Sequence, residues 1–170
     1  AYKTFGRLKL EQSYDFNELV KNRPLSPIFI ELDFLPVNYF SLQGDAEWCT
    51  YDNLFLSHNV AMRLADNRGD RLFLEHRYTR DDLETFYGDL TVSIYDRLSM
   101  FGKYERDIED GEGVEYGFGF LYMAQCWSVD IGYYNEEGDR KYAFMINLYG
   151  LGGLGSGFVG QRVENPFEYH

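Results

Sequence analysis

The fold is decided by the stretch from Val114 to Gly153, which reads VEYGFGFLYMAQCWSVDIGYYNEEGDRKYAFMINLYGLGG. Three times in this stretch, large apolar or aromatic side chains alternate with small or polar ones. A period of two is the period of a β-strand, whose successive side chains point to opposite faces. The apolar positions of the three runs are Tyr116, Phe118, Phe120, Tyr122, then Trp127, Val129, Ile131, Tyr133, then Tyr142, Phe144, Ile146 and Leu148. The stretch therefore predicts three strands with one apolar face and one small or polar face.

The same alternation continues through the rest of the chain. It predicts seven further strands, over residues 5–16, 28–35, 40–48, 54–64, 72–78, 85–94 and 98–105. Short polar connections separate them, of which Asp66 to Asp70 is a strong turn signal. No segment shows a 3.6-residue period over the length of a helix. About ten regularly spaced strands of this kind favour an all-β fold, either an antiparallel barrel or a sandwich.

Strand length and the chemistry of the two faces favour a membrane barrel. Several strands run for about 9 to 12 residues, the length that crosses a bilayer at a tilt, whereas sandwich strands are shorter. The polar face carries glycines and charged groups, as the lining of a lumen would. On the apolar face, tyrosine and tryptophan lie near strand ends, where an aromatic girdle would form. A soluble sandwich or ligand-binding barrel is the alternative.

Composition excludes several classes of function. The 170 residues carry a net charge of −12, which disfavours binding to a phosphate backbone, so no nucleic-acid partner is expected. No apolar run is long enough for a transmembrane helix, and the start lacks a signal-peptide pattern, so an exported protein would appear here as a mature form or an internal piece. Catalytic and phosphate-binding motifs are missing from the sequence, which predicts a protein that is not an enzyme and has no cofactor or metal.

Several motifs resemble the LptD family, the lipopolysaccharide-assembly proteins of the outer membrane. The resemblance runs from about Gly6 to Gly155. The motifs that carry it are Tyr122-x-x-x-Cys126-Trp127, Asp139-Arg140-Lys141, Ile146 to Gly152, Ser13-Tyr14-Asp15, Glu31 to Pro36 and Tyr39 to Leu42. The barrel of that family has about 26 strands. The resemblance therefore implies the C-terminal portion of a larger transmembrane β-barrel, with residues 1–155 in the barrel and 156–170 as a periplasmic tail.

The resemblance also implies a function, a location and partners. The expected function is a part in the outer-membrane translocon that inserts lipopolysaccharide into the outer leaflet of a Gram-negative bacterium, in a multi-pass β-barrel. The implied partners are lipopolysaccharide, an LptE-like plug lipoprotein, the periplasmic proteins of the lipopolysaccharide bridge and the barrel-insertion machinery. A small autonomous barrel, porin-like or adhesin-like, is the alternative, and it would require residues 6–16 to pair with residues 141–149.

Three sets of candidate site residues follow. Cys126 lies where the family has a cysteine that forms a disulfide with the N-terminal periplasmic domain, although one cysteine stands here in place of an adjacent pair. The last strand resembles the strand at the lateral seam of the family, and its residues are Tyr142, Phe144, Ile146, Leu148 and Gly150. The polar residues that alternate with the apolar ones along each strand would line the lumen. They include Glu31, Asp33, Asp45, Glu47, Arg63, Glu75, Arg77, Asp89, Lys103, Glu105 and Asp130.

Overall fold

The structure is a computed structural model that describes residues 5–15, 23–108, 114–136 and 138–156. Within these ranges the chain forms eleven β-strands, and no helix that could span a membrane is found there. The strands are β1 (Gly6–Glu11), β2 (Ile28–Val37), β3 (Phe40–Cys49), β4 (Leu54–Ala65), β5 (Arg71–Thr79), β6 (Leu83–Tyr95), β7 (Leu98–Asp107), β8 (Val114–Met123), β9 (Trp127–Glu136), β10 (Asp139–Leu148) and β11 (Gly152–Ser156).

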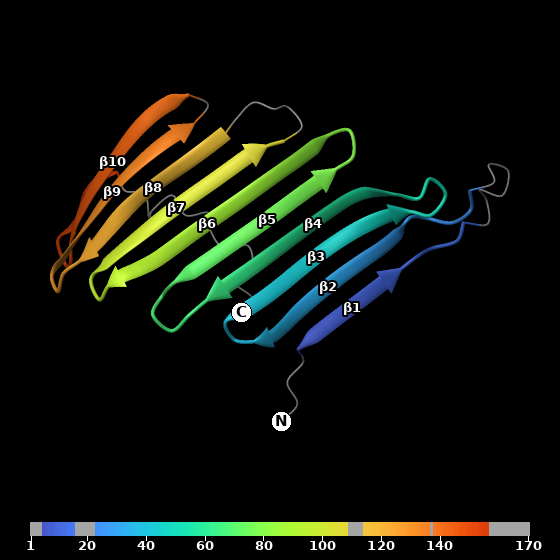
Figure 1. The fold of residues 1–170 in the computed structure, drawn as a ribbon, viewed down its shortest axis with the longest axis horizontal. Helices are drawn as coiled ribbons and strands as arrows, with labels where there is room; N and C mark the ends of the chain where they lie inside the picture. The colour runs from blue at the N-terminus through green and yellow to red at the C-terminus, as the bar shows by residue number, and fades with distance from the viewer. Residues whose placement is uncertain (1–4, 16–22, 109–113, 137, 157–170) are drawn as a thin grey trace.

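Each strand pairs in antiparallel fashion with the next one along the chain, so the sheet order is simply β1 to β11. Figure 1 shows β1 to β10 side by side in this order. Most connections have only a few residues and return the chain beside the strand it has just left, which produces this meander. The prediction of an all-β antiparallel fold is confirmed. The sheet is open: β1 pairs only with β2, and β11 only with β10, among the described strands.

The strand β11 goes beyond the ten strands that the sequence pattern predicts. It pairs with residues 144–148 of β10, yet Leu154 is its one large side chain, so it offers no alternation to recognise. Gly152 and Gly155 both have φ of +104°, a backbone conformation that residues with side chains rarely adopt. The tail expected over residues 156–170 therefore starts inside a strand at Ser156, and its remainder, 157–170, lies outside the described residues.

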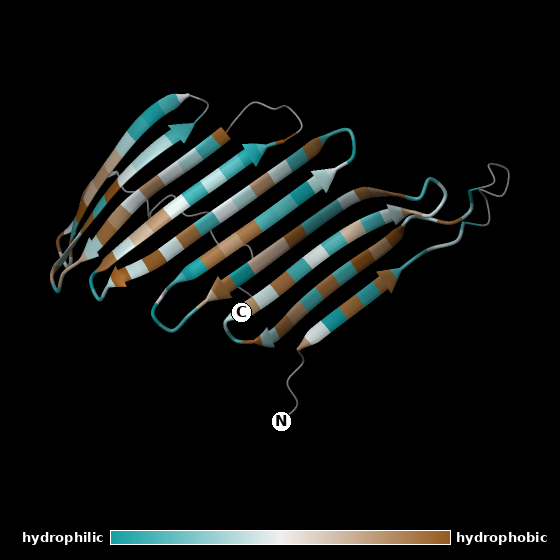
Figure 2. Cartoon of the chain, in the orientation of Figure 1, coloured by the Kyte–Doolittle hydropathy of each residue, from teal (hydrophilic) through white to brown (hydrophobic). Residues whose placement is uncertain are grey.

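The register separates the side chains into two faces, named here the polar face and the apolar face. One cross-strand row of the polar face runs through Glu31, Asp45, Asn59, Arg77 and Thr85. The adjacent row of the apolar face runs through Leu32, Gly44, Val60, His76 and Phe86. Figure 2 shows the same division as hydrophilic and hydrophobic bands that alternate along the strands.

A bulge between β3 and β4 changes the parity at one end of β4. Glu47 pairs with Ser57, but the next residue, Trp48, pairs with Phe55, so one residue of β4 is extra. Phe55 therefore faces the apolar side, with its ring centroid 6.4 Å from that of Trp48. The alternation in the sequence predicts Leu56 at that place. The prediction is wrong there because a bulge inserts one residue without interrupting the strand.

The most enclosed residues all lie on the polar face. Each of the residues that are almost inaccessible to solvent has its side chain or Cα on the polar face. They are Ala61, Glu75, Thr91, Phe101, Gly117, Gly119, Ser128, Asp130 and Gly132. Large side chains of the apolar face are exposed instead, among them Phe118, Ile131 and Phe144. A water-soluble sandwich buries its apolar face against a second sheet. The described strands form a single layer with the opposite distribution, so the sandwich alternative is not supported (Figure 1).

The connections alternate between two ends of the sheet. One end, called the long-loop end, holds the connections 12–27, 50–53, 80–82, 108–113 and 137–138. The other, called the short-turn end, holds the connections 38–39, 66–70, 96–97, 124–126 and 149–151. Outer-membrane barrels have long loops on the outer side and short turns on the periplasmic side.

Candidate functional site

The candidate site is the polar face, because the residues expected to line a lumen all lie on it. The strand register places on this face Glu31, Asp33, Asp45, Glu47, Arg63, Glu75, Arg77, Asp89, Lys103, Glu105 and Asp130. They come from β2 to β7 and from β9, so they cover most of the width of the sheet. A strand presents alternate residues to one face, which is why a pattern read along single strands assembles into one wall.

Neighbouring strands of this wall are linked by ion pairs. Arg7 of β1 pairs with Glu31 and with Asp33 of β2. On β7, the ammonium of Lys103 lies 3.3 Å from Glu105 and 3.8 Å from Glu115 of β8. These side chains are partly exposed, and ion pairs of this kind contribute at most about 1 kcal/mol each to stability. Their main effect is to offset charge on a face that is otherwise rich in carboxylates.

Two carboxylates of the polar face are buried. Glu75 is 8% exposed and accepts hydrogen bonds at 2.9 Å on both of its oxygens from Arg77, two residues along the same strand. Asp130 is 2% exposed and pairs across the sheet with Leu121 and Met145. Sequence alternation predicts that both side chains face the lumen, but it does not predict their burial.

A stripe of small residues crosses the polar face over β8 and β9. Gly117, Gly119 and Gly132 are buried in it, and the ring of Phe101, which is 3% exposed, covers Gly119. A Cβ at Gly119 would lie 2.4 Å from Cζ of Phe101 and 2.3 Å from the carbonyl oxygen of Ile131. The role of Phe101 is missed by the sequence analysis. An aromatic residue on a polar parity, opposite a glycine, is the signal that could have revealed it.

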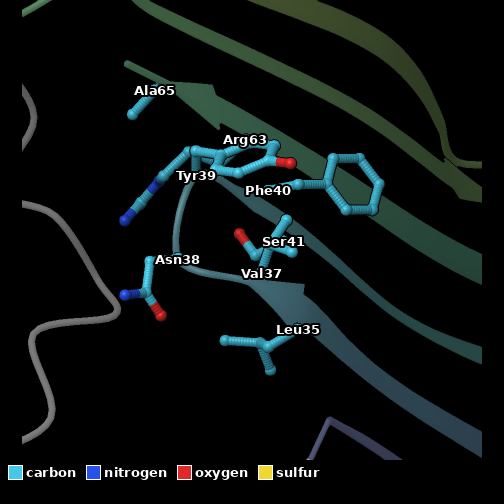
Figure 3. A pocket seen from close by; sticks show the side chains of 8 residues that line it. All are labelled: Leu35, Val37, Asn38, Tyr39, Phe40, Ser41, Arg63 and Ala65. Carbon is cyan, nitrogen blue, oxygen red and sulfur yellow. The ribbon is translucent and has the colours of Figure 1, made fainter. Parts of the chain in front are cut away.

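An amphipathic hollow of about 330 Å³ lies at the short-turn end of β2 to β4. Its walls come from both polar and apolar side chains, which Figure 3 shows around the turn that joins β2 to β3: Leu35, Val37, Asn38, Tyr39, Phe40, Ser41, Arg63 and Ala65. Arg63 also lies over the ring of Phe73, with 6.0 Å from the guanidinium carbon to the ring centroid. Such a hollow offers apolar contact and one cation to a molecule at the rim of the sheet.

The two cysteines lie at opposite ends of the sheet. Cys126 is exposed in the β8–β9 connection at the short-turn end, whereas Cys49 is the last residue of β3 at the long-loop end. Both are free thiols, and the Sγ of Cys49 donates to Oδ2 of Asp52 over 3.4 Å. This placement at opposite ends of the sheet disfavours a bridge between the two. The accessible position of Cys126 leaves its thiol available to another part of the protein.

The strand expected at the lateral seam is β10, and it has neighbours on both sides. It pairs with β9 over all ten of its residues and with β11 over five, from Phe144 to Leu148. Tyr142 lies before the segment that pairs with β11. Gly150 follows the strand, in the turn to β11, with φ of +90°. The edge of the described sheet at this side is therefore β11, and β10 is the strand behind it.

A clamp at the long-loop end ties two connections together. The guanidinium of Arg23 donates two hydrogen bonds of 3.0 Å to the two carboxylate oxygens of Asp52, and it lies 5.5 Å from the ring centroid of Tyr51. The hydrogen bonds from Arg23 lower the pKa of Asp52 below its ordinary value, and the weaker hydrogen bond from Cys49 lowers it further. Sequence reasoning misses the pair because 29 residues separate its members and neither belongs to a strand pattern.

Comparison with known proteins supplies an independent observation. No protein-family model matches the chain. Two curated proteins are similar to it, both named LPS-assembly protein LptD. The protein of Nitrosococcus oceani is 32% identical over 133 residues, or 76% of this chain, and that of Marinobacter nauticus is 27% identical over 156 residues, or 82% of this chain. The match covers only 18% of either relative, so the chain is similar to one part of LPS-assembly proteins of the LptD type.

Proposed function

We propose that this chain is the C-terminal part of the barrel wall of an LptD-type translocon, which inserts lipopolysaccharide into the outer leaflet of the outer membrane. The observation that carries the proposal is the inverted distribution of side chains: the buried residues, Glu75 and Asp130 among them, lie on the polar face, and large apolar residues are exposed on the other. The similarity to two LPS-assembly proteins supports the choice of substrate. No enzymatic step is part of the proposal.

The exposed apolar face suits contact with lipid. Nine of the strands, β2 to β10, are 9 to 13 residues long, close to the length that crosses a bilayer at a tilt. Tyr116 and Tyr122 lie on the apolar face near the two ends of β8, six residues or about 20 Å apart along the strand. Aromatic side chains at both interfaces are the usual girdles of an outer-membrane barrel.

The polar face would line the path of the lipid. A sugar-rich headgroup needs hydrogen-bonding and charged partners, and the partly exposed members of the wall, such as Arg77 and Lys103, provide them. The buried stripe around Gly119 leaves the wall thin over β8 and β9. Acyl chains would leave the lumen at a weak closure of the sheet, and the short strand β11, with β10 behind it, is placed to form one side of that seam.

The remaining expectations belong to the complete protein. The open edges β1 and β11 would pair with strands that lie in other parts of a longer chain, as the 18% coverage of the relatives suggests. Cys126, exposed at the short-turn end, would form a disulfide with the periplasmic domain. An LptE-like plug would occupy the lumen, and the periplasmic bridge would deliver lipopolysaccharide. Barrel-insertion machinery would assemble the protein.

Photo-crosslinking in the full-length protein tests the proposal. A photoreactive phenylalanine analogue replaces Arg77 on the polar face or, as the matched comparison, Asp81 in the connection after β5, which is highly exposed at the long-loop end. Newly made lipopolysaccharide should crosslink at position 77 only while transport is active. If position 77 gives no transport-dependent crosslink in a protein that is correctly assembled, the polar face does not conduct lipopolysaccharide.

The autonomous barrel is the second candidate, and the described sheet disfavours it. Such a barrel would require the first strand to pair with the last, whereas β1 and β11 lie at the two edges of the sheet in the described residues. A barrel of about eight strands also has an interior just wide enough for side chains or one small ligand. A closed pairing of residues 6–11 with β10 or β11, detected by engineered cross-strand disulfides in the purified chain, would revive this candidate.

A further inference from the structure

The apolar face carries very few charged residues or histidines, and all of them lie toward the long-loop end. Within the described strands they are His58, His76, Glu84, Arg106 and Arg140. Glu84 and Arg140 are the second residues of β6 and β10, and Arg106 is the last but one of β7. The two histidines lie in the long-loop halves of β4 and β5. The short-turn half of the same face, over the described strands, is free of such residues.

Three of the five form a hydrogen-bonded chain. Nε2 of His58 lies 3.2 Å from Nδ1 of His76, and Nε2 of His76 lies 3.3 Å from Oε1 of Glu84. The ring of Tyr78 stacks on His58 with 5.0 Å between centroids. With both imidazoles neutral, His58 donates to His76 and His76 donates to Glu84, so each of these contacts has one donor and one acceptor. The three residues of this hydrogen-bonded series therefore serve as partners for one another. The presence of the two arginines on an apolar face still needs an explanation.

Arg106 and Arg140 are exposed and make no ion pair with another described residue. Tyrosines lie on the strands between the two arginines. One cross-strand row runs from Tyr104 of β7 through Tyr116 of β8 and Asn135 of β9 to Arg140 of β10. The ring of Tyr133 is 6.2 Å from that of Tyr116 and 5.3 Å from that of Tyr142. Such a tyrosine cluster sits at the depth of lipid headgroups, which places both guanidinium groups there too.

We propose that Arg106 and Arg140, together called the arginine rim, bind lipids whose phosphate headgroup carries a net negative charge, where such lipids surround the barrel at its long-loop end. This inference rests on the proposed membrane role of the apolar face. A guanidinium group matches a phosphate through two parallel hydrogen bonds. The rim is cationic on a chain whose net charge is −12, and it continues directly into the apolar surface, so a lipid can fill both parts at once. Charge complementarity and continuity select a lipid with an anionic phosphate headgroup as the occupant.

The test uses a photoreactive phenylalanine analogue at Tyr116, which lies on β8 between the two arginines, in the full-length protein reconstituted into phosphatidylcholine vesicles. Trace amounts of radiolabelled phosphatidic acid or phosphatidylcholine with identical acyl chains are added, and the ratio of crosslink yields is measured. Phosphatidic acid should be preferred. The R106Q/R140Q variant should reduce that preference by roughly five-fold for each arginine, the effect of one cation near a charged membrane surface. The R106K/R140K variant should keep most of it.

A matched double variant separates local binding from a general change of charge. Lys9 and Lys141 lie on the polar face, and Lys141 is next to Arg140 in the same strand, so K9Q/K141Q removes the same charge from the opposite face. The preference should survive in this variant, and its loss there would contradict the proposal. Equal crosslinking of both lipids in the unmodified protein would overturn the arginine rim while leaving the membrane role intact. Crosslinking of neither lipid would overturn both.

Discussion

The ring of Phe101 lies directly over Gly119 on the polar face, where β7 and β8 pair these two residues. A Cβ at position 119 would come within 2.4 Å of Cζ of the ring and within 2.3 Å of the carbonyl oxygen of Ile131. One contact is with a buried side chain and the other is with the backbone of β9, so neither can move away easily. The glycine is therefore a packing requirement of the three strands.

The first prediction concerns this contact. The G119A variant should lower the free energy of unfolding by about 1–3 kcal/mol, the usual cost of overpacking. Thermal unfolding of the full-length protein in detergent, followed by its heat-dependent gel mobility, measures the effect. G102A is the matched control, because a Cβ there would have its nearest neighbour at an ordinary 3.8 Å. Equal behaviour of the two variants would show that the ring does not rest on Gly119.

A second prediction concerns an arginine placed on the apolar face of β4. Val60 is 43% exposed at the middle of this strand, and the adjacent Asn59 lies on the polar face. V60R should reduce the stability of the inserted barrel by about 2–4 kcal/mol, whereas N59R should cost much less because its cation meets a polar wall. Urea titration of the protein folded in vesicles measures both. The account is wrong about the two faces if N59R is the more harmful change.

The third prediction is a dependence on pH from the Arg23–Asp52 clamp. Because hydrogen bonds from Arg23 and Cys49 hold the pKa of Asp52 below its ordinary value of 3.8, the carboxylate binds protons less readily in the folded protein than in the unfolded one. The small contribution of the Asp52 carboxylate to the stability of the fold is therefore fully present when the pH is above the ordinary pKa. This contribution is lost as the pH falls through the lowered pKa of the folded protein.

Two variants check this sign. The difference in stability between the unmodified protein and D52N should be constant from neutral pH down to about pH 4 and should shrink below it. R23Q should show the same profile, because it removes the other half of the clamp. A difference that grows as the pH is lowered would contradict the assigned direction of the pKa shift.

A fourth prediction concerns Asp70, whose hydrogen bonds join the turn at 66–70 to strand β6 at the short-turn end. Oδ1 of Asp70 accepts from the backbone N–H of Ser93 at 2.7 Å, and Oδ2 accepts from Arg68 at 2.6 Å. D70A should cost about 1–3 kcal/mol because it leaves the Ser93 N–H without its acceptor. D70N keeps an acceptor oxygen and should cost less. Hydrogen exchange of the Ser93 amide provides a local readout, and unchanged protection in D70A would refute the link.

Alternation along the sequence was enough to predict the strands β2 to β10, the division into two faces and the sharing of one wall by residues as distant as Glu31 and Asp130. That success has a physical reason, since strand geometry depends on local periodicity alone. Phe55 shows the limit, because a bulge changes parity without a visible break in the pattern. The strand β11 shows another, because Leu154 alone cannot produce an alternation.

The details of the candidate site depend on pairs that the sequence does not bring together. Phe101 and Gly119 meet only because β7 and β8 pair in one register, and Arg23 reaches Asp52 from a connection that has no periodic pattern. The burial of Glu75 and Asp130 is likewise not visible in the alternation of the sequence. The roles of Cys126 and of the seam strand stay predictions, since both concern parts of the protein beyond this sheet.

The most direct test of the account measures which face of β9 meets lipid. Spin labels are placed one at a time at residues 128 to 134 of the full-length protein in vesicles, with Cys49 and Cys126 replaced by serine, and their accessibility to oxygen and to a water-soluble nickel complex is compared. The account predicts a period of two, with oxygen favoured at Val129, Ile131 and Tyr133 and the nickel complex relatively favoured at the positions between them. The opposite phase, or no alternation at all, would contradict it.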